Sequence, residues 1–285
     1  MFHSPGPIAL HVGPIALRWY GVLMALAMAL GLWLGHRDAR RRGLDPESLL
    51  KAAELALLGG LVGARLYYVL FNLDYYSQFP GKIFAVWEGG LAIHGGVIAG
   101  VLVGGAYAWR RHLPLRQFLD VAAPSLALGQ AIGRWGNFFN EEAFGRPTDL
   151  PWKLFISPPN RPLQYAQSEF FHPTFLYESL WDLVVFLLLF FVLRDRLKRA
   201  PGALFLAYLG LYSVGRLFTE GLRIDPLMLG SLRIAQLVSL LGMAVAAVGV
   251  PLLLRQHQRP AWPPPGARVK RHACRGGRAR VLVGG

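Results

Sequence analysis

The chain has 285 residues, of which 54% are hydrophobic and 16% charged, and its formal net charge is +14 at pH 7. This composition is too apolar and too lightly charged for an ordinary soluble domain, so it favours an integral membrane protein. The Lys and Arg residues lie in short clusters between apolar runs, without a basic stripe interleaved with stacking aromatics, which argues against a nucleic-acid partner. The single cysteine, Cys274, excludes an intrachain disulfide and a cysteine-rich metal site.

Apolar windows long enough to cross a bilayer recur along the chain, since about 20 apolar residues span the hydrocarbon core. In chain order, the predicted transmembrane helices cover residues 17–35, 52–73, 91–109, 118–139, 174–193, 202–219 and 234–254. The first window is longer than a signal-peptide core and no basic region precedes it, which predicts a retained helix. We therefore expect an all-α integral membrane protein, a bundle of seven transmembrane helices. Six is the alternative, because the fourth and sixth windows are less apolar.

The charges in the links between these windows alternate. The links after the first, third and fifth windows read HRDARRRG, RRHLPLR and RDRLKR, and the segment after the seventh is also basic, whereas the other links hold fewer bases and more acids. Cytoplasmic loops collect Lys and Arg, so the pattern predicts an N-terminus outside and a C-terminus in the cytoplasm. Residues 1–254 are expected to form the transmembrane domain that carries any catalytic site. Residues 255–285 are expected to form a basic, Pro/Arg-rich cytoplasmic tail, disordered and facing anionic lipid.

Polar groups from six distant segments reach the outer half of the membrane in this topology. They are Tyr20, Arg65 with Asn72, His94, GRWGNFFNEEAFG (residues 133–145), HPTFLYE (172–178) and GRLFTEGLRID (215–225). A charged side chain near mid-bilayer costs about 2.5–3.5 kcal/mol, so a scaffold would have little reason to carry several. Guanidinium groups hold phosphate oxygens bidentately and stay charged. The cluster therefore predicts a site for a phospholipid headgroup in the outer leaflet.

These motifs resemble those of the prolipoprotein diacylglyceryl transferase family. GRWGNFFNEEAFG fits the family pattern Gly-Arg-x-Gly-Asn-Phe-apolar-Asn-x-Glu-x-x-Gly at every defined position, and the similarity extends over about residues 15–255. The resemblance implies a bacterial inner-membrane enzyme that moves the diacylglyceryl group of phosphatidylglycerol onto the lipobox cysteine thiol of a preprolipoprotein. Such a reaction forms a thioether and releases glycerol phosphate. Its implied partners are phosphatidylglycerol, the preprolipoprotein signal peptide and the lipid bilayer.

The resemblance, together with helical spacing around Arg216, also yields the candidate site residues. Catalytic roles are expected for Tyr20, His94, Arg134, Glu142, Arg216 and Glu220. Substrate binding is expected for Arg134, Asn137, Gly145, Glu178, Arg216 and Arg223. Neither a metal nor a cofactor is expected, because the sequence holds no His-Glu-x-x-His and no Gly-rich loop ending in Gly-Lys-Ser/Thr.

Several roles stay open between a functional and a structural interpretation. The arginines at 134 and 216 grip the phosphate, or they are structural ion-pair partners of Glu142 and Glu220. His94 takes the thiol proton, or it is only a hydrogen-bonded structural group while a nearby arginine lowers the thiol pKa. The glutamates at 142, 178 and 220 are expected to orient arginines. Asn137 is expected to bind the lipid headgroup or else unpaired backbone groups at the helix end. Tyr20 acts in the site, or it is an aromatic residue of the membrane interface.

Two wider alternatives also remain open. The outer stretch 152–172 covers the site or receives the signal peptide, or it packs as an ordinary interfacial loop. For the whole protein, the alternative is a phospholipid-binding transporter or flippase. Such a protein would need polar groups along a path to both faces of the membrane, whereas the inner halves of these helices carry almost no polar groups.

Overall fold

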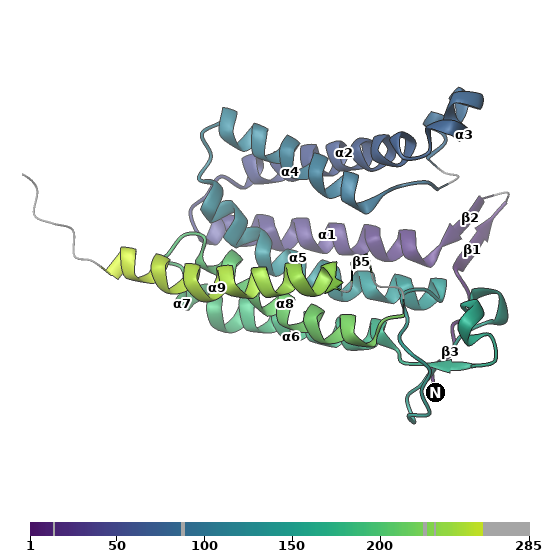
Figure 1. Ribbon diagram of the computed structural model, residues 1–285. Coiled ribbons are helices and arrows are strands. Elements are labelled where there is room, and N and C mark those ends of the chain that lie inside the picture. Colours follow the sequence, from purple (N-terminus) through teal and green to yellow (C-terminus); the bar gives the residue numbers. More distant parts are fainter. Residues whose placement is uncertain (14, 87–88, 225–226, 231, 259–285) are drawn as a thin grey trace, which may run out of the picture.

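The computed structural model describes residues 1–13, 15–86, 89–224, 227–230 and 232–258 (Figure 1). Long helices dominate it: α1 (Trp19–Arg41), α2 (Pro46–Leu70), α4 (Ile93–Arg110), α5 (Leu115–Asn140), α6 (Thr174–Leu187), α8 (Ala203–Leu222) and α9 (Ile234–Gln258). A π-helical turn, Leu188–Leu193, continues α6 into the short α7 (Arg194–Arg196). The prediction of an all-helical architecture is confirmed, and each predicted apolar window lies mainly on one of these helical segments.

Short elements cover one end of the helices. The helical turns are α3 (Leu73–Gln78), η1 (Pro80–Phe84), η3 (Pro158–Asn160) and η4 (Leu163–Tyr165). Three antiparallel two-stranded pairs join β1 (Ile8–Val12) to β2 (Ile15–Arg18), β3 (Leu154–Phe155) to β4 (Phe170–Phe171), and β5 (Met228–Leu229) to β6 (Leu232–Arg233). In Figure 1, β1, β2 and β3 lie at one end of the helices and α7 lies at the other.

Three helices are long and apolar enough to cross a membrane by length and composition: Trp19–Arg41, Thr174–Arg196 and Ile234–Gln256. The number of spans and their direction remain predictions. The local sequence nevertheless explains where helices begin and end. Asp45 accepts hydrogen bonds from the backbone N–H groups of Glu47 and Ser48, with Pro46 at the first helical position, so α2 begins there. Arg40 and Arg41 complement the negative end of the α1 dipole.

Small residues bring α2 and α4 into close contact. A Cβ on Gly63 would lie 2.1 Å from the Cβ of Ala99, and one on Gly95 would lie 2.4 Å from the carbonyl oxygen of Gly63. Such contacts are impossible for any larger residue, so the two helices can approach this closely only with glycine at the crossing. The α2–α4 pair lies beside α1, as Figure 1 shows.

Two buried clusters fix the other half of the molecule. One fills the space between α5, α6 with its π-helical continuation, and α8, around Leu189 and Leu204. The second lies under the strands at the other end, where Leu154, Ile156 and Phe171 are almost fully buried. Three side chains of the stretch 152–172 thus belong to a core, while residues such as Trp152 and Leu163 stay exposed. That observation supports the structural alternative for these side chains and also gives the nearby polar residues a firm base.

Candidate active site

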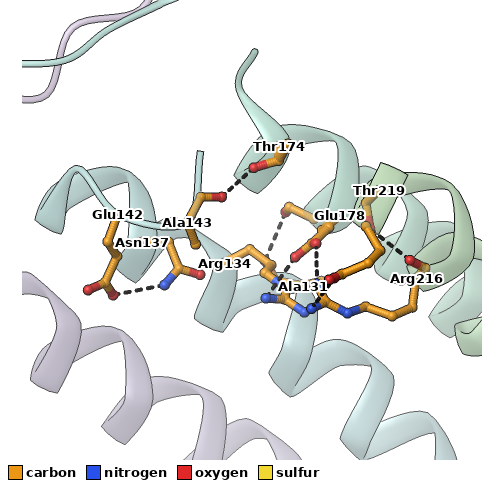
Figure 2. Close-up of polar contacts among 11 residues, drawn as sticks. Ala131, Arg134, Asn137, Glu142, Ala143, Thr174, Glu178, Arg216 and Thr219 are labelled. Atoms are coloured by element: carbon orange, nitrogen blue, oxygen red, sulfur yellow. Dashed lines mark hydrogen bonds and ion pairs between the residues drawn. The ribbon is translucent and has the colours of Figure 1, made fainter. Parts of the chain in front are cut away.

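Two arginines from different helices, Arg134 and Arg216, contact the carboxylate of Glu178 on a third helix (Figure 2). These residues and Glu220 form the arginine cluster. Nη1 of Arg134 on α5 lies 2.7 Å from Oε2 of Glu178 on α6, and Nη1 of Arg216 on α8 lies 2.8 Å from Oε1 of the same residue. Nη2 of Arg216 lies 2.7 Å from Oε2 of Glu220, one helical turn further along α8. One carboxylate therefore positions two guanidinium groups that are far apart in sequence.

The carboxylates in this cluster are buried, whereas the guanidinium groups reach outward. The side chains of Glu178 and Glu220 are 6% and 2% exposed, compared with 19% for Arg134 and 21% for Arg216. A guanidinium carries five N–H donors, and the ion pair with Glu178 uses only Nη1 of Arg134. The arrangement presents positive charge toward the more exposed side while the balancing negative charge stays beneath it. This geometry suits an incoming anion.

Close packing on each side of the cluster sets the distances between the helices. The hydroxyl of Ser179 donates to the carbonyl of Ala131 at 2.8 Å and accepts from Nε1 of Trp135 at 3.1 Å, which ties α6 to α5. Nε1 of Trp181 donates to the carbonyl of Leu211 on α8 at 2.8 Å. A Cβ on Gly215 would lie 2.1 Å from the Trp181 ring, so the glycine before Arg216 is needed to let α8 approach α6.

Glu142 does not pair with Arg134 in the structure. Instead, Nδ2 of Asn137 donates to Oε1 of Glu142 at 2.8 Å, and Nδ2 of Asn140 lies 3.4 Å from the same oxygen. Of the two ion pairs that the structural alternative expects, Arg134 with Glu142 is thus not formed among the described residues, whereas Arg216 with Glu220 is. Glu142 and Asn137 form a separate polar patch at the end of α5, beside the arginine cluster (Figure 2).

The ring of Tyr20 packs on α5 beside this patch. A Cβ on Gly136 would lie 2.4 Å from Cδ2 of Tyr20, so the glycine makes the contact possible, and the tyrosine stays 38% exposed. Trp19 stacks on Phe139 with 4.7 Å between ring centroids. The two aromatic residues thus attach the start of α1 to the turn of α5 that carries Asn137.

Gly145 lies where three chain segments cross. Its N–H donates to the carbonyl of His172 at 3.0 Å, and the N–H of Arg146 donates to the carbonyl of Leu222 at 2.9 Å. A Cβ at residue 145 would lie 2.8 Å from the Cβ of His172, closer than packed carbon atoms come. Gly145 thereby joins the end of α5 to the start of α6 and the end of α8. Arg223, paired with Gly145 through a β-bridge, ends α8 at this crossing.

His94 lies apart from the arginine cluster. It is an exposed residue at the start of α4, with its ring 6.4 Å from that of Tyr67 on α2, centroid to centroid. Within the described ranges, no hydrogen bond or ion pair joins it to Arg134, Arg216 or their glutamates. The structure thus brings together the residues from α5, α6 and α8 and leaves His94 on the neighbouring α2–α4 pair.

Two buried acids near the site escape the sequence analysis. Asp182 follows Glu178 by one turn of α6, is 3% exposed, and its Oδ2 accepts no hydrogen bond from the described part of the chain. Glu141 is 8% exposed and accepts three hydrogen bonds of 2.9–3.0 Å, from the N–H and hydroxyl of Ser157 and from Asn160. The i, i+4 spacing could have indicated Asp182. Nothing in the sequence distinguishes Glu141 from Glu142.

The long helices and the arginine cluster together define an all-helical membrane protein whose polar site is built around two arginines. Among the residues the structure describes, no group of three or more His, Cys, Asp or Glu side chains could hold a metal ion. The sequence model of the prolipoprotein diacylglyceryl transferase family matches residues 7–252. The chain belongs to that family, and it is therefore a transferase.

Curated relatives are similar over nearly the whole chain. A phosphatidylglycerol–prolipoprotein diacylglyceryl transferase of Synechococcus elongatus is 53% identical over 253 residues, which cover 87% of this chain and 88% of the relative. Enzymes of the same name from Trichormus variabilis and Thermosynechococcus vestitus are 51% and 48% identical, covering 88% and 93% of this chain and 90% and 98% of theirs. The aligned region includes every described element of the arginine cluster.

Proposed function

We propose that this protein transfers the sn-1,2-diacylglyceryl group of phosphatidylglycerol to the lipobox cysteine thiol of preprolipoproteins, the first step of bacterial lipoprotein maturation. The relatives' names supply the two substrates. The proposal rests on the two ion pairs by which Glu178 positions Arg134 at 2.7 Å and Arg216 at 2.8 Å. Two arginines held side by side match the phosphate that the substrate and the leaving group share.

The chemistry is a displacement at a primary carbon. The cysteine sulfur attacks the glyceryl carbon that bears the phosphate ester, a C–S bond forms, and the C–O bond breaks with its electron pair going to the phosphate oxygen. Glycerol phosphate leaves, and the thiol proton goes to a base. Negative charge therefore grows on the phosphate in the transition state, where the guanidinium groups of Arg134 and Arg216 stabilise it more than they stabilise the substrate.

Glu178 and Glu220 are positioning residues in this proposal. They are buried beneath the arginines and fix the guanidinium planes before the lipid arrives, so little reorganisation is needed during the reaction. Asn137 and Glu142 form a neighbouring polar patch that suits the hydroxyl groups of the glycerol headgroup. Gly145 and Arg223, joined by a β-bridge, connect the chain after α5 to the end of α8 next to this patch. Tyr20 flanks the patch on the α1 side.

The thiol proton goes either to His94 or, without a dedicated base, to water. His94 is exposed and its imidazole can act as a general base, but it lies on the α2–α4 pair, so it reaches the thiol only if the signal peptide brings the cysteine between α4 and α5. The alternative is that the positive field of the two arginines lowers the thiol pKa from about 8.5, which favours thiolate without a dedicated base. The transfer rate of His94→Gln separates the two, because loss of a general base lowers the rate by about 100-fold or more, whereas the alternative leaves it nearly unchanged.

For the membrane arrangement we propose seven spans in the bacterial inner membrane, with the N-terminus outside and the C-terminus in the cytoplasm. The alternation of basic links along the sequence supports this orientation. In it, the arginine cluster faces the outer leaflet, where the signal peptide emerges. The tail proposed for residues 255–285 begins on the last turn of α9, which ends at Gln258, and otherwise lies outside the described residues.

The test is a liposome assay with purified protein, phosphatidylglycerol and a synthetic lipobox signal peptide, followed by peptide mass and released glycerol phosphate. Arg134→Ala should lower the transfer rate by about 100-fold to 1000-fold, the usual cost of one transition-state charge contact. The matched control is Arg110→Ala, an exposed arginine at the end of α4. Folded wild-type protein that gives no diacylglyceryl mass gain would overturn the proposed function. Full activity in Arg134→Ala would instead overturn the role of the cluster.

A further inference from the structure

A second charged cavity lies at the end of the helices opposite the arginine cluster. It has a volume of about 400 Å³ and is formed by the end of α1, the start of α5 and the segment around α7. Its basic lining residues are Arg41, Arg42, Arg194 and Lys198, and its acidic ones are Asp38, Asp120 and Asp195. The recess at Arg134 and Arg216 shares none of these lining residues, so this cavity is not part of the active site.

The buried acids in the cavity already have partners. Oδ2 of Asp38 lies 2.8 Å from Nε of Arg42, and its Oδ1 lies 3.4 Å from Nη1 of Arg194. Asp120 accepts hydrogen bonds from the backbone N–H groups of Gly202 and Phe205 at 2.8 and 2.9 Å, where it caps the start of α8. These carboxylates therefore have little capacity left to attract a cation.

The basic groups, in contrast, keep unused donors. Nη2 of Arg42 is buried yet has no hydrogen-bond partner in the described ranges, and leaving a buried charged donor unpaired is costly. Arg41 and Lys198 are exposed at the mouth, where no ion pair with another described residue neutralises them. Asp195 is the single acid there without a described partner. The unmatched donors inside and at the mouth thus favour an anion.

We propose that this cavity binds a phosphate group, with Arg42 at its floor and Arg41 and Lys198 at its mouth. Phosphate accepts several charge-assisted hydrogen bonds at once, and the volume also accommodates a glycerol or similar small headgroup. Basic pockets between membrane helices on the cytoplasmic side are suited to the headgroups of anionic inner-leaflet lipids. Such a lipid would bridge the ends of α1, α5 and α7. A soluble phosphate ester would use the same contacts.

The experiment measures where the phosphate binds. Wild-type protein is reconstituted in phosphatidylcholine nanodiscs, in nanodiscs that also contain phosphatidylglycerol, and in phosphatidylcholine nanodiscs with added glycerol phosphate. Hydrogen–deuterium exchange is then compared in residues 36–44 and 194–203. We expect slower exchange there with phosphatidylglycerol. Protection by glycerol phosphate alone would assign the site to a soluble phosphate ester, and protection by neither anion would overturn the proposal.

The variant Arg41→Gln/Lys198→Gln removes the two mouth cations, which are exposed, so the fold should be retained. Its matched control, Arg40→Gln/Arg199→Gln, removes the same charge from exposed neighbours that do not line the cavity. We expect the first variant to need about tenfold more phosphate-bearing ligand for the same protection, as for loss of a charge-assisted hydrogen bond, and the control to behave as wild type. Equal losses in both would overturn the proposal in favour of general charge attraction.

Arg42→Lys tests the floor of the cavity. Lysine keeps a cation beside Asp38 but removes the unpartnered Nη2, so protection should weaken while diacylglyceryl transfer at the other end continues. Unchanged protection in this variant would show that the ligand does not reach Arg42 and would contradict the proposed site.

Discussion

Arg65 and the Arg134–Arg216 pair are both arginines on helices near the same end of the molecule, but their environments differ. Arg65 is 7% exposed and donates five hydrogen bonds, all to backbone carbonyls: those of Lys82, Ile83, Ala85, Gly89 and Gly90. A guanidinium has five N–H groups, so this one has none left for a ligand. Its charge also lies 5.3 Å from the centre of the Tyr76 ring.

Arg134 and Arg216 are held by carboxylates instead, and their side chains are about one fifth exposed. The contrast teaches that the cost of placing an arginine in a membrane does not by itself mark a functional site. Arg65 offsets that cost through its five hydrogen bonds to carbonyls that precede α4. The other two keep donors on a more exposed side. Which donors remain after the protein's own contacts are counted is the better criterion.

Replacing the shared carboxylate should give the largest effect. In Glu178→Gln, the amide cannot hold two guanidinium groups as the carboxylate does at 2.7 and 2.8 Å. We expect kcat to fall by about 100-fold or more, with a much smaller change in KM for phosphatidylglycerol, because positioning matters most in the transition state. Steady-state kinetics in liposomes measure both. A rise in kcat would mean that Glu178 competes with the phosphate and would contradict its positioning role.

The sequence predicts the parts of this site that depend on short-range spacing. The Arg216–Glu220 ion pair follows from i, i+4 geometry, and α1, α4 and α6 begin close to the starts of the predicted windows at residues 17, 91 and 174. The Arg134–Glu178 ion pair could not be predicted in the same way, because it depends on how α5 packs on α6. The structural interpretation of Arg134 takes Glu142 as its partner, but Glu142 accepts a hydrogen bond from Asn137 instead. Glu141, with a left-handed φ of 52°, ends α5 just before Glu142.

Arg65→Met should affect stability rather than chemistry. It leaves five carbonyls without their donor, and we expect a loss of about 2–3 kcal/mol in the free energy of unfolding. Arg65→Lys, with three donors, should lie between Met and wild type. Thermal unfolding in detergent measures the order of the three proteins. If Arg65→Met unfolds like wild type but has lost transfer activity, the arginine belongs to the substrate site and the contrast with Arg134 fails.

Glu141→Gln should have the smallest effect. The amide can still accept a hydrogen bond, but its NH₂ group faces the donors of Ser157 and Asn160, so we expect a cost of about 1–2 kcal/mol. Because Glu141 ties the 152–172 stretch to the end of α5, hydrogen exchange should rise around residue 157 while kcat changes only a few-fold. Glu169→Gln, an exposed glutamate in the same stretch, is the matched control. A loss of activity as large as that of Glu178→Gln, without faster exchange, would mean that Glu141 takes part in the reaction. Its assignment to holding the 152–172 stretch, rather than to binding the lipid, would then be wrong.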